Sequence, residues 1–171
     1  MADISVPFLD LTPRDQGLAE ELFEAFSSVI SRGRFVLGPE VSAFEREFAS
    51  FCGTREAVGV ASGTDALILA LKSLGISPGD EVLTPALSAP PTAVAVSLAG
   101  GRPVFVDINP ETRCIDPDKI EEAIGPRTRF LLVVHLYGRL ADMREPARIA
   151  EEHGLALVED CAQAHGARAD G

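Results

Sequence analysis

A group of unlike polar side chains follows an apolar run late in the sequence. The segment "LALVEDCAQAHGA", residues 155–167, passes from an apolar stretch into two acids, a cysteine, a glutamine and a histidine. A carboxylate such as Asp160, at a strand end that faces a half-buried cleft, can hold a protonated ring nitrogen, because the ion pair favours the charged form of both groups. For a pyridine cofactor, this pairing supplies the electron sink that its chemistry needs. The segment therefore indicates a ligand-binding turn.

Structural interpretations of the same segment stay open beside the functional one. Asp160 can cap a following helix, and Cys161 and His165 can line the core or form a chance C-x-x-x-H pair. A zinc site needs three or four ligands, and neither His135 nor His153 stands at a spacing that completes one. We therefore expect no metal site.

A second turn has the features of an anion site. The stretch "VASGTDAL" places Ser62, Gly63 and Thr64 after an apolar run and at the start of a helical pattern. Backbone N–H groups and the positive helix end attract an anion, glycine lets it approach closely, and the hydroxyls add hydrogen bonds. The alternative is an ordinary helix cap, where serine and threonine are favoured regardless of function. Neither a P-loop nor a dinucleotide fingerprint occurs, so a single phosphate fits better than a dinucleotide.

The third turn lies within "VVHLYGRLADM", where a very apolar run ends in His135 and Tyr137. We interpret His135 as a hydrogen-bonded structural residue that fixes neighbouring loops. Acid or base catalysis by His135 is the alternative.

These turns need a scaffold, and the sequence pattern predicts one. Short apolar runs, typical of strands, alternate with amphipathic segments, typical of helices. We expect strands at "AVGVA" from 57, "EVLTP" from 81, "RPVFVD" from 102, "RFLLVVHLYG" from 129 and "LALVED" from 155, and helices from 64, within 90–101, from 116 and from 143. Strands that are apolar on both faces and are separated by crossover helices predict an α/β fold, a mainly parallel sheet with helices on both faces. In such sheets, ligands collect beyond the carboxyl ends of the strands, which is where the three turns fall.

Two helical patterns precede the expected sheet. One covers residues 14–31, and the other begins at Pro39 and ends at Gly53. We therefore divide the chain into an N-terminal helical segment, 1–53, and an α/β domain, 54–171. Because the chain stops soon after its last expected strand, we expect this domain to be truncated at its C-terminal side.

The composition excludes several function classes. The formal net charge of −11 over 171 residues opposes binding to nucleic acid or to an anionic membrane. No run reaches the roughly 18 uninterrupted apolar residues that a membrane helix requires. The cysteines lack C-x-x-C spacing, and the start "MADISVPFLDLTPRD" has no signal-peptide pattern, so we expect a reduced, cytoplasmic protein.

In this order and at these separations, the turns resemble the DegT/DnrJ/EryC1/StrS family of sugar aminotransferases, which are pyridoxal 5′-phosphate enzymes of the aspartate aminotransferase fold. The similar stretches are "GRFVLGPEVSAFEREFA", "VASGTDAL", "GDEVLTPALSAPPTAVAVSLAGGRPVFVDINPET", "VVHLYGRLADM" and "HGLALVEDCAQAHGA". The resemblance covers nearly the whole chain. It implies that this chain is the N-terminal part of such an enzyme, with the incomplete large domain of a fold-type I pyridoxal-phosphate enzyme.

The resemblance also implies a cofactor, substrates and site residues. Gly63 and Thr64 would bind the phosphate of pyridoxal 5′-phosphate, Asp160 would pair with its pyridine nitrogen, and Gln163 would hydrogen-bond near the phenolic oxygen of the ring. The implied substrates are a nucleotide-linked keto sugar and an amino-acid donor, for cell-surface polysaccharide or antibiotic sugars. The implied assembly is a homodimer.

The sequence departs from the family pattern in two places. Ala89 stands where the family usually has an aromatic residue that stacks on the cofactor ring. The family's Schiff-base lysine lies downstream of the Asp160 motif and beyond this chain, and Lys72 and Lys119, the only lysines, stand elsewhere. We therefore expect no catalytic residue in this chain and no amination by the chain alone. The alternatives are a sugar dehydratase of the same fold, in which histidine replaces the lysine, and a truncated non-catalytic protein that keeps the pocket.

Overall fold

The computed structural model describes residues 11–12 and 15–169, without the side chain of Gln16. The chain divides into two compact units, residues 1–57 and 58–171, which are described separately. No helix in the described ranges is both long and apolar enough to cross a bilayer.

The first unit contains two helices, α1 (Gln16–Arg32) and α2 (Pro39–Cys52). Pro39 is the first residue of α2, a position at which its missing N–H is not needed. Gly53 ends the helix in a left-handed conformation, with φ 69°. Glycine adopts this conformation without the steric cost of a Cβ atom, so the helix stops where the sequence predicts.

The second unit contains a four-stranded sheet. Its strands are β1 (Glu81–Pro85), β2 (Arg102–Val106), β3 (Thr128–Val134) and β4 (Ala156–Asp160). They lie in the order β2-β1-β3-β4, and each neighbouring pair is parallel. The predicted α/β fold with a mainly parallel sheet is confirmed.

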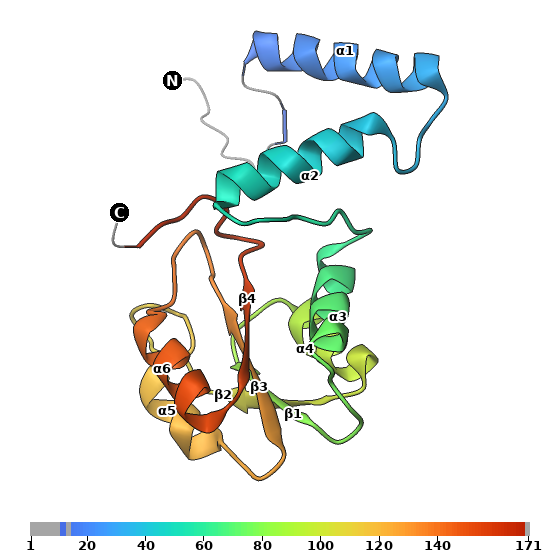
Figure 1. Cartoon of the computed structure of the whole chain (residues 1–171). Helices are drawn as coiled ribbons and strands as arrows, with labels where there is room; N and C mark the ends of the chain where they lie inside the picture. The colour runs from blue at the N-terminus through green and yellow to red at the C-terminus, as the bar shows by residue number, and fades with distance from the viewer. Residues whose placement is uncertain (1–10, 13–14, 170–171) are drawn as a thin grey trace, which may run out of the picture. The chain divides into compact units, whose positions relative to one another are not determined.

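Four helices cover the two faces of this sheet (Figure 1). On one face lie α3 (Gly63–Ser73) and α4 (Pro90–Ala99), and on the other lie α5 (Pro117–Ala123) and α6 (Arg144–His153). Each of these helices falls where the sequence predicts one. Because parallel strands need crossover connections, this helix content and the parallel sheet follow from each other.

Each face of the sheet has its own buried apolar core, and alternation along the strands decides which core a side chain joins. Val82 and Val158 belong to the core under α3 and α4, whereas Leu83, Leu131 and Val133 belong to the core under α5 and α6. A strand with apolar residues at odd and even positions can fill both cores at once. This explains why the central strands read as continuous apolar runs.

One expected strand does not form. The run "AVGVA", residues 57–61, has no strand conformation and does not belong to the sheet, and Val58 is 78% exposed. A strand exists only where its N–H and C=O groups pair with a neighbour, and β-branched residues alone do not supply that neighbour. The prediction of a strand at this position was wrong.

The amino ends of three strands meet at one carboxylate. Glu81, at the start of β1, accepts hydrogen bonds from the Arg102 guanidinium at 2.8 Å and from the Arg127 guanidinium at 2.8 and 3.1 Å. The hydrogen bond from Arg127, with that from Arg102, lowers the pKa of Glu81 below its ordinary value of 4.5, against the effect of burial. Glu81 is therefore a buried acid that stays charged at neutral pH.

Candidate cofactor site

The strand order creates a crevice at the carboxyl edge of the sheet. From β1 the chain crosses to β2 on one side, and it returns to β3 on the other side. The helices that follow β1 and β3, α4 and α6, lie on opposite faces of the sheet, so the loops after β1 and β3 diverge. Such a topological switch point is where open α/β sheets bind ligands.

Asp160 is the last residue of β4 and is half-buried. Its carboxylate oxygen Oδ1 accepts a hydrogen bond from the N–H of Ala162 at 3.0 Å. Turns rather than a helix follow over 161–169, so the interpretation of Asp160 as a helix cap was wrong. Among the described residues, no cationic side chain forms an ion pair with Asp160. By alternation it faces the same side as Val158, toward α3 and α4.

Gln163 is held by the turn that follows β3. Its side-chain oxygen Oε1 accepts from the main-chain N–H of Tyr137 at 3.1 Å, and its carbonyl accepts from the N–H of Gly138 at 2.8 Å. Tyr137 has a φ of 57°, a strained conformation for a residue with a side chain, and Gly138 follows with φ 76°. Because a backbone N–H can only donate, the amide atom that faces it is the oxygen, and the Nε2 group is left to donate elsewhere.

The N-terminus of α3 combines a cap with open space. The Ser62 hydroxyl accepts from the N–H of Asp65 at 3.1 Å and donates to its carboxylate at 2.8 Å, so Ser62 is the cap. The Ser62 carbonyl accepts from the N–H of Ala66. The N–H groups of Gly63 and Thr64 precede these bonds and stand at the positive end of the helix. Apart from the neighbouring residues and the backbone of α3 itself, no atom of the described chain lies within 4 Å of where a Cβ on Gly63 would be.

His135 is a buried structural residue, as predicted. It is 1% exposed, its Nδ1 accepts from the N–H of Ala141 at 3.1 Å, and its Nε2 lies 3.0 Å from a Glu159 carboxylate oxygen. Since Nδ1 accepts, the ring proton sits on Nε2 and is donated to Glu159. His135 thereby ties the turn after β3 to the end of β4.

The same contact brings His135, Glu159 and Cys161 together, with potential ligand atoms within 4.8 Å of one another. Sequence spacing did not reveal this group, because its members come from two strand ends. The Nε2 atom that would coordinate a metal carries the proton donated to Glu159, so the hydrogen bond to Nδ1 disfavours a metal here. Cys161 and His165 are both exposed, so the interpretation that they line the core was wrong.

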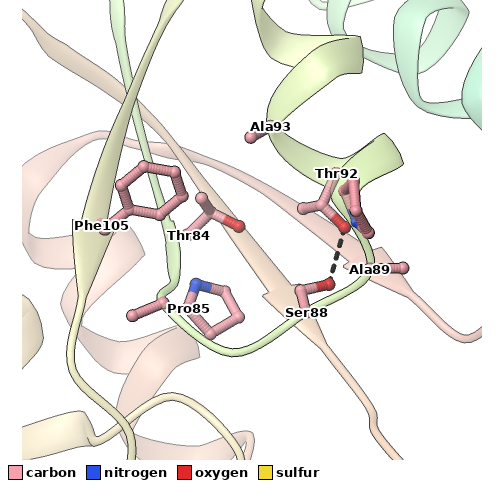
Figure 2. A pocket seen from close by; sticks show the side chains of 9 residues that line it. Thr84, Pro85, Ser88, Ala89, Thr92, Ala93 and Phe105 are labelled. Carbon is pink, nitrogen blue, oxygen red and sulfur yellow. Dashed lines mark hydrogen bonds between the residues drawn. The ribbon is translucent and has the colours of Figure 1, made fainter.

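A hollow of about 200 Å³ lies beyond the end of β1, beside Ala89 (Figure 2). Its lining combines small, proline and hydroxyl side chains with one aromatic ring: Thr84, Pro85, Ala86, Ser88, Ala89, Pro90, Thr92, Ala93 and Phe105. Ala89 is exposed at the start of α4 and offers only a methyl group. Sequence reasoning singled out Ala89 but missed the hollow, which depends on residues from β2 as well.

Neither lysine lies with these groups. Lys72 is in the last turn of α3, where its Nζ lies 3.4 Å from the carbonyl of Ala99, about 12 Å along the helix from Thr64. Lys119, on α5, pairs with Glu122 at 3.4 Å. The residues that are present, a carboxylate, an amide donor and a helix N-terminus, fit a cofactor that carries a ring nitrogen, a ring oxygen and a phosphate.

A parallel sheet covered by helices on both faces, with unlike polar groups at its carboxyl edge, belongs to the class of α/β domains in which ligands bind at that edge. The chain belongs to the DegT/DnrJ/EryC1/StrS aminotransferase family, whose model matches residues 16–171. The family resemblance seen in the sequence is therefore confirmed.

Individual relatives agree with this assignment. The chain is 52% identical over 163 residues to the dTDP-3-amino-3,4,6-trideoxy-alpha-D-glucose transaminase of Streptomyces venezuelae, a match that covers 95% of this chain and 43% of the relative. The crystal structure of DesV from S. venezuelae superposes with a TM-score of 0.91 at 51% identity, over 94% of this chain and 43% of that one. NtdA from Bacillus subtilis, with bound cofactor PMP, superposes with a TM-score of 0.87 at 39% identity, over 97% of this chain and 39% of that one. The chain thus spans less than half the length of the relatives it matches.

Proposed function

We propose that this chain is the N-terminal part of a pyridoxal-phosphate-dependent aminotransferase that moves an amino group from an amino acid to a nucleotide-linked keto sugar. The observation that carries the proposal is the orientation of Gln163 beside Asp160. Its Oε1 is occupied by the N–H of Tyr137, so its Nε2 is left as an amide donor, three residues after a half-buried carboxylate at the carboxyl edge of the sheet. A protonated pyridine with an anionic ring oxygen needs that combination of groups.

Each site residue has a distinct role in this proposal. The N–H groups of Gly63 and Thr64 bind the cofactor phosphate, Asp160 keeps the pyridine nitrogen protonated, and the Nε2 of Gln163 donates to the phenolic oxygen. His135 positions the two strand ends through Ala141 and Glu159 and does not touch the reacting atoms. When bound, pyridoxal phosphate supplies the electron sink for amino transfer.

The substrate class comes from the relatives. The S. venezuelae protein is named a transaminase of a dTDP-linked amino sugar, and its match covers nearly this whole chain. The acidic composition of this chain is compatible with a small-molecule substrate and disfavours a polyanionic one.

Neither Lys72 nor Lys119 supplies the Schiff-base amine, the lysine amine that bonds covalently to the cofactor in this family. Both side chains are engaged by groups outside the site, at the far end of α3 and on α5. Positioning a reactive amine beside its partner contributes a large share of catalysis, which a distant amine cannot supply. We therefore propose that this chain alone binds the cofactor but does not aminate a sugar.

The test combines binding, covalent trapping and activity on the purified chain. Pyridoxal 5′-phosphate is titrated by absorbance, the mixture is reduced with borohydride, and adducts are mapped by mass spectrometry. We expect saturable binding that inorganic phosphate competes away, no stoichiometric adduct on either lysine and no transfer from glutamate. Absence of saturable cofactor binding by a folded chain contradicts the proposal of a cofactor site. A stoichiometric adduct on Lys72 or Lys119 together with transaminase activity contradicts the assignment of the amine.

A further inference from the structure

The hollow beyond β1 contains a buried polar atom without a partner. Thr84 is fully buried, and its hydroxyl Oγ1 makes no hydrogen bond in the structure. Figure 2 shows this hydroxyl on the side of the strand that faces Ser88 and Thr92. Burying a hydroxyl without a partner is unfavourable, so such an atom calls for a ligand or a water that completes it.

Two further hydroxyls face the same space. Ser88 Oγ and Thr92 Oγ1 lie 2.7 Å apart and form a hydrogen bond in which either can donate. A hydroxyl pair uses one proton between its members, so one donor and several acceptor positions stay available. With Thr84, the hollow therefore offers both donors and acceptors to a bound group.

The chemistry of the lining favours a neutral group over an anion. None of the residues that line the hollow is charged. Pro90 and Pro91 begin α4, so this helix N-terminus lacks the N–H groups that bind an anion elsewhere. A phosphate or carboxylate would find hydroxyls here but no charge and few main-chain donors.

Phe105 gives the hollow an apolar wall. It pairs with Thr84 in the register between β1 and β2, and its side chain is 58% exposed. An exposed aromatic face beside converging hydroxyls suits a ring that has both an apolar face and hydroxyl groups, as a pyranose has. At about 200 Å³ the hollow is smaller than the roughly 300–1,000 Å³ of pockets that hold whole drug-sized ligands, so it suits one ring of a larger molecule.

The hollow also has the right place in the fold. Thr84 faces α4, as Val82 does, and Asp160 faces the same side of the sheet, as Val158 does. Strands β1 and β4 are separated only by β3, and the strand register puts Thr84 level with Val158, two residues before Asp160, so Thr84 and Asp160 lie about 12 Å apart. A ring bound in the hollow would lie beside a cofactor held by Asp160.

We propose that the Thr84 hollow is a subsite for the sugar ring of the substrate, with Thr84 Oγ1 hydrogen-bonded to a sugar hydroxyl and Phe105 against the apolar face of the ring. This inference rests on the proposed function, because it takes the substrate to be a sugar. It adds a specificity-determining residue, Thr84, and a ligand class, a neutral hydroxylated ring.

The experiment follows the Thr84 methyl group by NMR in the purified, methyl-labelled chain. The probes are dTDP-α-D-glucose, free dTDP and methyl α-D-glucopyranoside. We expect the two sugar probes to shift the Thr84 methyl signal saturably, whereas free dTDP leaves it in place. A Thr84 signal that no sugar probe moves means a water-filled hollow only, and it overturns the proposal.

Three variants sharpen the test. Thr84→Val removes the hydroxyl at nearly constant volume, and should weaken dTDP-α-D-glucose binding about tenfold while its melting temperature stays at or above that of the wild type, because no hydrogen bond is lost. Ala93→Leu fills the hollow and should abolish the binding of the sugar ring, whereas Val94→Leu, one residue along α4 and outside the lining, should leave it unchanged. Equal sugar affinity in Thr84→Val and the wild type overturns the proposal, as does a fall of several degrees in the melting temperature of Thr84→Val.

Cofactor binding separates this inference from the proposed function. Thr84→Val should bind pyridoxal 5′-phosphate as the wild type does, since Thr84 touches none of the groups assigned to the cofactor. Normal cofactor binding with no sugar-dependent shift removes the subsite and leaves the cofactor site. A sugar-dependent shift of Thr84 without any cofactor binding supports the subsite and removes the cofactor site.

Discussion

At the scale of single residues, the candidate site depends on which atom of Gln163 faces outward. The N–H of Tyr137 can only donate, so it fixes the amide with Oε1 inward and Nε2 outward. The backbone of Tyr137, which has a strained positive φ, therefore occupies the acceptor atom of the Gln163 amide and leaves its Nε2 group as a donor.

Gln163→Glu tests this orientation. Glutamate keeps an acceptor for the N–H of Tyr137 but presents a negative oxygen where the amide donor stood. We expect cofactor affinity at pH 7 to fall at least tenfold, because two anionic oxygens would face each other. The affinity is measured by absorbance titration with pyridoxal 5′-phosphate. The 3-deoxy analogue, which lacks the phenolic oxygen, serves as the control and should bind the variant and the wild type alike. A variant that binds both cofactors equally well would argue against this role for Gln163.

Asp160→Asn tests the pairing with the ring nitrogen. An amide cannot balance the charge of a protonated pyridine, whereas the phosphate contacts at Gly63 and Thr64 persist. We expect cofactor binding to be largely retained, and turnover of the family enzyme that contains this segment to fall by orders of magnitude. Steady-state kinetics and cofactor titration measure the two effects. Near-normal turnover in this variant would remove Asp160 from the role.

The residue types of this site were readable from the sequence, but their contacts were not. The order "VEDCAQAHG" identifies an acid and an amide after a strand, and it does so locally. The partners of His135, by contrast, are Ala141 and Glu159, and the second lies on another strand. Only the parallel pairing of β3 with β4 brings Glu159 to His135, and no spacing within one segment reports that pairing.

At the scale of elements, helices and paired strands were predictable because their signals are local. Asp15 caps α1, Gly53 ends α2, and the central strand β3 carries five consecutive apolar residues, Phe130 to Val134. The run 57–61 has the same composition as a strand, and nothing in its own residues shows whether a neighbour pairs with it. Strand formation is a property of two segments, so one segment cannot predict it.

Leu71→Ala tests the core between α3 and the sheet. Leu71 is fully buried in α3, so the truncation removes apolar contacts and leaves a cavity. We expect a loss of about 2–5 kcal/mol in the free energy of unfolding, measured by urea denaturation. Leu74, which follows α3 and is 50% exposed, gives the matched control, and Leu74→Ala should cost less than about 1 kcal/mol. Similar losses in the two variants would contradict the assigned core.

Glu81→Gln tests the carboxylate shared by three strands. The pKa of Glu81 is lowered in the folded chain, so its stabilising effect is present above the ordinary value of 4.5 and is lost as the pH falls through the lower folded value. We expect the variant to melt at a lower temperature than the wild type at pH 7. The difference should shrink as the pH falls below 4.5. Melting curves from pH 7 to pH 3 measure it, and a difference that is constant with pH would contradict the charge-dependent role.

At the scale of the whole molecule, the predicted homodimer stays a prediction with a specific surface. Helix α1 exposes large apolar side chains that a single helix cannot bury: Leu18, Leu22, Phe23, Phe26 and Ile30. Such a face favours association, and most soluble homo-oligomers are two-fold symmetric. We expect sedimentation velocity at micromolar concentration to show a dimer, and the double substitution of Phe23 and Phe26 to serine to shift it toward monomer. A stable wild-type monomer would contradict this prediction.

The hydrogen bonds of Glu81 also depend on the register between β1 and β2. A slip of β2 along β1 by two residues would keep every side chain on its proper face, so hydrophobic burial alone barely resists it. That slip would move Arg102 by about 7 Å and leave Glu81 without one of its two guanidinium partners. Glu81 would keep its hydrogen bonds from Arg127 but lose the one from Arg102, so the misaligned sheet would lack one charge-assisted hydrogen bond of the native sheet. The hydrogen bonds at the amino edge of the sheet thus favour the strand register that places the loops of the candidate site at the opposite edge.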